Sequence, residues 1–201
     1  MNELVDVDFL AYRDEIRWFP YPELTILNRS IPGHGWSFEP NRNIFFCNIP
    51  KCASTSIKNY IIATDNLDYK DPFYFTVIRD PKERLKSALW MMNAGQVTFT
   101  LNEFVDDMKN NEVNDSVFMH TAPQTEFINN SPLAGHFDLK IYRIDQIDEI
   151  FNVKMPQENA SSHSDSYKQF TQMFNEQYDL YASYLEDYYA DDIMLWNSMN
   201  K

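Results

Sequence analysis

One short segment of the chain combines a cation, small residues and a run of hydroxyl groups. The segment NIFFCNIPKCASTSIKNYII covers residues 43–62 and has its polar part in the middle. That part consists of Lys51, Cys52, Ala53, Ser54, Thr55 and Ser56. Small side chains let backbone approach a ligand, while the lysine and the hydroxyls donate hydrogen bonds. We therefore predict that this set holds a phosphate-type anion.

A second segment, FYFTVIRDPKERLKSALW (residues 73–90), carries an arginine and a serine in a comparable place. Arg79 directly follows an apolar run, and Ser87 lies eight residues later in a stretch with helical periodicity. A guanidinium and a hydroxyl that converge beside a strand end form a second phosphate site. Two anion sites in one chain indicate a ligand with two separate phosphate groups.

The hydrophobic pattern predicts the elements that position these residues. Ile44–Ile49 and Phe73–Ile78 are short apolar runs, which are typical of buried strands. A helical pattern follows each run, and Asp80-Pro81 suits the start of the second helix. The first N–H groups of a helix attract anions, and ligands of open α/β sheets bind beyond the carboxyl ends of the strands. We expect both segments to face one crevice.

A simpler interpretation stays open for each of these side chains. Ser and Thr often precede a helix as caps, so Ser54–Ser56 is a plain helix start in that interpretation. Lys51 is then a solvated loop lysine, and we expect Lys82 and Lys86 to lie on a solvated helix face. The presence of both segments, each after a strand-like run, favours the anion-site hypothesis.

Together the two segments resemble motifs of the PAPS-dependent sulfotransferases, in particular the carbohydrate-type branch. IPKCASTSI is similar to the family's 5′-phosphosulfate loop, and IRDPKERLKSAL is similar to its 3′-phosphate motif. Ala53 stands where the family commonly has glycine. The resemblance implies that Lys51 and the loop residues after it bind the phosphosulfate of PAPS, while Arg79 and Ser87 bind its 3′-phosphate.

A later segment supplies a candidate for proton transfer. Residues 119–124, MHTAPQ, resemble a His-x-x-Pro-Gln segment that the carbohydrate branch places near the acceptor. Because histidine titrates near neutral pH, we predict His120 as the general base and Lys51 as the cation that stabilises the leaving phosphate. A loop-stabilising role is the alternative for His120. Glu83 is another candidate base, although its basic neighbours favour an ion pair. Weaker candidates are His34, His136 and His163.

The resemblance implies a hydroxyl-bearing acceptor, and we expect a carbohydrate. Aromatic side chains before the two motifs are candidates for a sugar-stacking wall, with packing as the alternative. They are Trp18, Phe19, Tyr21, Trp36 and Phe38. The oligomeric state stays open.

The expected fold is α/β, a P-loop-like three-layer sandwich with a central, mainly parallel sheet and a helical C-terminus. We expect strands at about 43–49, 73–78 and 139–142. The length of 201 residues suits one sulfotransferase domain over 1–201, with 1–42 as an N-terminal extension and a candidate for the acceptor side. An aromatic stripe in the C-terminal part is expected to be buried. It comprises Phe170, Phe174, Tyr178, Tyr181, Leu185 and Tyr188.

Composition narrows the class of partner and the location. A formal net charge of −13 argues against nucleic acid and anionic membranes. No apolar stretch reaches the length of a membrane span and the N-terminus lacks a targeting pattern, so we expect a soluble, cytoplasmic enzyme of a microbe or virus. The two cysteines, Cys47 and Cys52, have no histidines at zinc spacing. We expect reduced thiols and no metal.

The function predicted from these residues and the resemblance is transfer of a sulfuryl group from PAPS to a hydroxyl, releasing PAP. One alternative is a P-loop-type kinase, although the chain has no GxxxxGK[ST] motif. A requirement for ATP and Mg²⁺ would favour the kinase. The other alternative is a catalytically inactive PAP- or PAPS-binding interaction protein.

Overall fold

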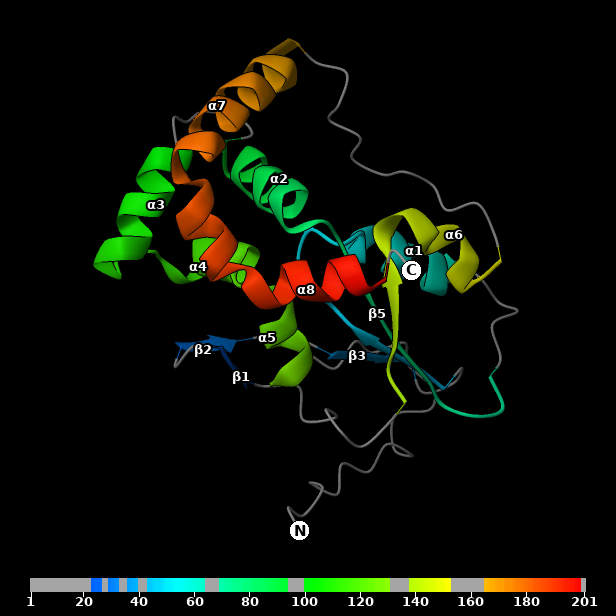
Figure 1. Cartoon of the computed structure of the whole chain (residues 1–201). Helices are drawn as coiled ribbons and strands as arrows, with labels where there is room; N and C mark the ends of the chain where they lie inside the picture. Colours follow the sequence, from blue (N-terminus) through cyan, green and yellow to red (C-terminus); the bar gives the residue numbers. More distant parts are fainter. Residues whose placement is uncertain are drawn as a thin grey trace.

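The fold is α/β, with a sheet between two groups of helices (Figure 1). This computed structural model describes residues 23–26, 29–32, 36–39, 43–63, 69–93, 100–130, 138–152 and 165–199. The expected α/β architecture, with a central, mainly parallel sheet and a helical C-terminus, is confirmed.

Four strands form the central sheet in the order β3-β4-β5-β6. Their bounds are Trp36–Glu39 for β3, Ile44–Cys47 for β4, Phe73–Ile78 for β5 and Lys140–Arg143 for β6. β3 runs antiparallel to β4, whereas β4, β5 and β6 run parallel. The three strands expected from the apolar runs are therefore the three parallel ones. Two further strands, β1 (Glu23–Ile26) and β2 (Arg29–Pro32), form a separate antiparallel pair.

Most of the described chain is helical. The helices are α1 (Ser54–Ala63), α2 (Pro81–Asn93), α3 (Leu101–Asn110), α4 (Asp115–Thr121), α5 (Gln124–Asn129), α6 (Ile147–Ile150), α7 (Asp165–Tyr188) and α8 (Ala190–Ser198), with a 3₁₀ turn at Ile144–Gln146. Helix α2 begins at Pro81 as expected, and Asp80 Oδ1 accepts a hydrogen bond from the Glu83 N–H at 2.9 Å. The Asp-Pro pair thus supplies the predicted cap and first turn.

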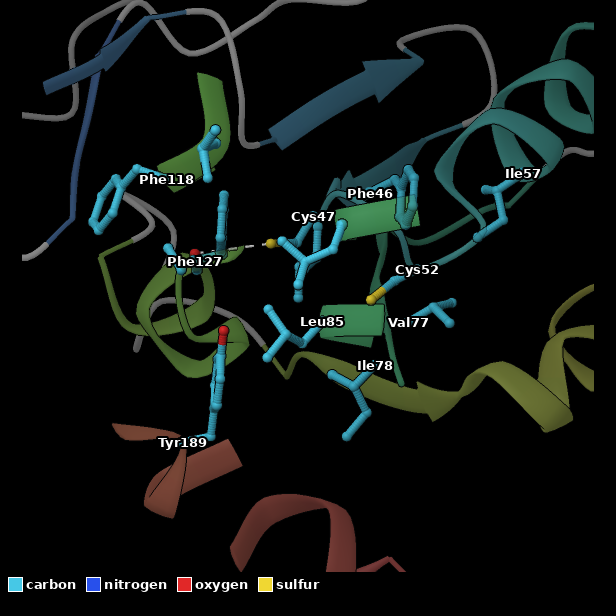
Figure 2. Packing of buried hydrophobic residues seen from close by; sticks show 14 of the residues in the cluster. Phe46, Cys47, Cys52, Ile57, Val77, Ile78, Leu85, Phe118, Phe127 and Tyr189 are labelled. Atoms are coloured by element: carbon cyan, nitrogen blue, oxygen red, sulfur yellow. Dashed lines mark hydrogen bonds between the residues drawn. The ribbon is translucent and has the colours of Figure 1, made fainter. Parts of the chain in front are cut away.

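Neighbouring residues of β4 point to opposite faces of the sheet and show which helices cover each face. On one face, the Phe46 ring stacks on the Phe75 ring. Phe75 also packs edge-on against Phe151 at the end of α6, with the ring centroids 5.8 Å apart. On the other face, the Cys47 thiol donates to the Phe127 carbonyl of α5 at 3.8 Å (Figure 2). Figure 1 shows α1 beside α6, and α2 and α8 on the other side of β5 and β6. These are the three layers that the sequence predicts.

The C-terminal helices complete the second helical layer. Helix α7 packs on α2 and α3, and α8 packs on α2, α5 and α7. The expected aromatic stripe is buried at Phe170, Phe174, Tyr178 and Leu185, whereas Tyr181 and Tyr188 are only partly buried. In the described part of the chain, no helix has the length and apolar character that crossing a membrane requires.

Candidate anion-binding site

The carboxyl ends of β4 and β5 lie side by side, and a cation follows each of them. The parallel register pairs Cys47 with Thr76, so the two strands end at the same edge of the sheet. Lys51 lies in the loop after β4, and Arg79 is the first residue after β5. The structure therefore brings the two predicted anion-binding segments together at one edge, as expected for ligand sites of parallel sheets.

The loop after β4 turns sharply before helix α1. Lys51 and Ala53 have positive φ angles of 68° and 59°, and the Cys52 N–H donates to the Ile49 carbonyl at 3.3 Å. The Ile57 N–H donates to the Ala53 carbonyl at 3.0 Å, which starts the helical hydrogen bonding. Turns of this kind leave backbone N–H groups available at a helix start, where anions bind. The positive φ of Ala53 also explains why glycine suits this position.

Replacing Ala53 by Gly should stabilise the protein by about 0.5–1 kcal/mol. A side chain in the left-handed region costs about 1–2 kcal/mol, and the greater freedom of glycine in the unfolded chain offsets part of that gain. Urea unfolding measures the difference. As the matched control, Ala182→Gly within helix α7 should destabilise the protein by about 1 kcal/mol. A loss of stability in Ala53→Gly would contradict the backbone geometry of the loop.

Three cations gather around this loop, and no carboxylate of the described residues forms an ion pair with them. Burial lowers the pKa of Lys51, and the positive charges of Arg79 and Arg84 lower it further. Among the described residues, ion pairs join carboxylates to Lys86, Arg143 and Lys168, and none joins a carboxylate to any of these three cations. Positive charges held close together without a partner favour the binding of an anion. Such a cluster of cations is unusual in a chain with a formal net charge of −13.

Arg84 is almost completely buried, although the charge pattern around it suggests a solvated helix face. Its side chain is 1% exposed; Nε donates to the Pro50 carbonyl at 2.9 Å and Nη1 donates to the Ala122 carbonyl at 2.7 Å. Nη2 has no hydrogen-bond partner among the described residues. The guanidinium also lies over the Phe127 ring, 5.9 Å from its centroid. Arg84 thus joins the loop after β4 to the segment between α4 and α5.

Gln124 is a second residue whose contribution no sequence pattern predicts. Its Oε1 accepts from the Arg79 N–H at 2.8 Å and from the Cys52 thiol at 3.1 Å, and its Nε2 donates to the Arg79 carbonyl at 2.8 Å. The resemblance to a His-x-x-Pro-Gln segment indicated that this region lies near the site, but not that the glutamine side chain contacts both strand ends.

The remaining described site candidates lie on helices α1, α2 and α4. His120 is partly buried in the last turn of α4, and α4 packs on α2, which carries Ser87. In α1, Ser56 is buried, Ser54 is partly buried and Thr55 is exposed. The roles assigned to these side chains stay predictions.

Two lysines and a glutamate on α2 differ in how well their surroundings agree with the expectations from the charge pattern. Glu83 forms the expected ion pair, with Oε1 2.6 Å from the Nζ of Lys86. The expectation that Lys86 is solvated is wrong, because α2 turns this residue toward the protein and it is buried. Lys82 Nζ lies over the Tyr178 ring, 4.3 Å from its centroid.

Both cysteines are free and buried, in agreement with the expected reduced thiols. Burial is the main cause that raises their pKa values, to about 12 for Cys47 and about 11 for Cys52. A thiol with so high a pKa is a poor nucleophile at neutral pH. Cys52 therefore contributes to the loop through its hydrogen bond to Gln124 rather than through thiol chemistry.

Several of the candidates lie outside the described residues. These candidates are His34, His136, His163, Trp18, Phe19 and Tyr21. For Trp36 and Phe38, only the strand β3 that carries them is described. The residues that are described contain no group of three or more His, Cys, Asp or Glu side chains arranged to hold a metal ion. Comparison with protein-family models, with curated proteins and with solved structures found no match for this chain.

Proposed function

We propose that the chain binds PAPS and transfers its sulfuryl group to a hydroxyl acceptor, releasing PAP. The observation that supports this most is the pair of adjacent strand ends with Lys51 and Arg79, neither of which pairs with a carboxylate among the described residues. Two cations on neighbouring strand ends suit a ligand that has two separate phosphate groups.

Each candidate residue has a role in this proposal. Lys51, Ser54, Thr55 and Ser56 bind the 5′-phosphosulfate together with the backbone at the start of α1. Arg79 with Ser87 binds the 3′-phosphate. The acceptor oxygen attacks sulfur and His120 takes its proton, while the bond between sulfur and the bridging phosphate oxygen breaks. Negative charge then develops on the departing phosphate, where a fixed cation lowers the barrier. Lys51 supplies that cation.

The identity of the acceptor and the location belong to the same proposal. A carbohydrate hydroxyl is the proposed acceptor, because the resemblance is to the carbohydrate-type branch of sulfotransferases. A cytoplasmic location is proposed with it. A metal ion has no part in the proposed reaction, since the charge on the leaving phosphate is met by Lys51 and the start of α1.

Calorimetry with PAP, compared with ATP and Mg²⁺, tests the donor site. We expect PAP to bind without a divalent ion and to displace PAPS. A labelled-sulfate transfer assay over a panel of glycans and small alcohols then identifies the acceptor class. Absence of PAP binding would refute the proposal, and a requirement for ATP and Mg²⁺ would support the kinase. PAP binding without transfer to any acceptor would support an inactive binding protein.

A further inference from the structure

The C-terminal helix α8 reaches the candidate site through a buried carboxylate. Asp192 lies in the first turn of α8 and is 1% exposed. Its Oδ2 accepts from the Gln124 N–H at 2.7 Å, and its Oδ1 accepts from the Thr125 N–H and hydroxyl, both at 2.8 Å. Helix α5 begins at Gln124 after Pro123, and Pro123 makes no side-chain cap. Asp192 thus caps α5 from another part of the chain.

This cap fixes the residue that holds both strand ends. Gln124 is the first residue of α5 and is 1% exposed. Besides its bonds to Arg79 and Cys52, its Nε2 lies 3.3 Å from Asp192 Oδ2. Oε1 and Nε2 therefore each contact two partners. An amide with so many buried partners has little freedom to rotate, because each rotation leaves a polar group unpaired.

The cations of the site need such a restraint. Lys51, Arg79 and Arg84 carry like charges that repel one another; burial lowers the pKa of Lys51 most, and the charges of Arg79 and Arg84 lower it further. With no anion bound, that repulsion favours separation of the loop after β4 from the end of β5. Gln124 opposes this separation, since one amide binds Cys52 on the first segment and the backbone of Arg79 on the second.

We propose that Gln124, fixed by Asp192, is a positioning residue that keeps the two cationic strand ends at the spacing needed for a ligand with two phosphate groups. The inference rests on the proposed function for the identity of that ligand. It gives the C-terminal helix a role in donor binding, although Asp192 lies 68 residues beyond Gln124 along the chain.

Two readouts on the purified full chain test this inference. The first is the affinity for PAP by calorimetry. The second needs no ligand: the pKa of Lys51, followed by NMR of labelled lysine side chains and assigned with Lys51→Arg. In Gln124→Ala the affinity should fall about tenfold, because a ligand gains less from groups that are no longer preorganised. The Lys51 pKa should rise toward its ordinary value of 10.5 as Arg79 moves away.

Thr76→Val is the matched control. The Thr76 hydroxyl donates to the Cys47 carbonyl at 2.9 Å. This hydrogen bond joins β5 to β4 within the sheet rather than in the loops that follow the two strands. This variant also loses one buried hydrogen bond, but PAP affinity and the Lys51 pKa should match those of the unmodified protein. Asp192→Asn tests the same link if Gln124→Ala does not fold, because an amide donor there faces the N–H groups of α5.

The outcomes separate the two proposals. If the unmodified protein does not bind PAP, the proposed function fails, and the Lys51 titration alone decides the positioning role. An unchanged Lys51 pKa in the folded Gln124 and Asp192 variants, with PAP affinity also unchanged where PAP binds, overturns the positioning role. A change of equal size in Thr76→Val overturns it as well, since general loosening of the sheet would then explain the result.

Discussion

Replacing Lys51 by Ala is expected to lower the turnover of sulfuryl transfer by about two to three orders of magnitude, the scale seen when a preorganised charge stabiliser is lost. Lys51 is partly buried in the loop that leads into α1. Its charge is close to Arg79 and Arg84, and no carboxylate pairs with it among the described residues. In the proposed reaction this charge is available to the leaving phosphate. Single-turnover transfer from labelled PAPS measures the effect.

Two variants control this experiment. Lys70→Ala removes the same charge from an exposed position before β5, at the opposite end of that strand, and should leave turnover unchanged. Lys51→Arg keeps the charge but alters its geometry, so it should recover part of the lost rate. Turnover in Lys51→Ala close to that of the unmodified protein would refute the role of Lys51, provided that the same sample binds PAP.

The parts of the fold that local pattern determines were predictable from the sequence. β5 occupies Phe73–Ile78 as expected, because a short apolar run flanked by polar residues has few alternatives to a buried strand. Helix α2 begins at Pro81, since Asp-Pro specifies a helix start within a few residues. The position of Lys51 and Arg79 at one edge of the sheet was predictable as well, because neighbouring parallel strands end at the same edge.

The contacts that hold the site together were not predictable in the same way. Gln124 and Asp192 are 68 residues apart, and Arg84 and Ala122 are 38 apart. No periodicity within one segment specifies such pairs, which exist only once α5 and α8 have packed. Arg84 lies among lysines on a helix whose sequence suggests a solvated face, so the pattern did not predict its burial either. An arginine is seldom fully buried without partners, and here both partners are backbone carbonyls.

Replacing Arg84 by Met should destabilise the fold by about 3–5 kcal/mol, because two buried carbonyl groups each lose a charged donor at about 1–3 kcal/mol apiece. Methionine fills much of the space, so the cavity contribution is small. The carbonyls of Pro50 and Ala122 would lose their hydrogen bonds, and these two residues belong to the two segments that meet at the site. Urea unfolding measures the free energy, and PAP affinity should fall in any fraction that stays folded.

Arg143→Met gives the comparison that isolates burial. Arg143 pairs with Asp145 at 2.6 Å and lies over the Trp196 ring, 4.2 Å from its centroid, but Asp145 is exposed. Exposed pairs contribute little, so this variant should lose about 1 kcal/mol or less. The same substitution thus compares a fully buried arginine bound to carbonyls with a partly buried one bound to an exposed carboxylate. Equal losses in the two variants would contradict the structural role of Arg84, because the difference rests on its two buried backbone partners.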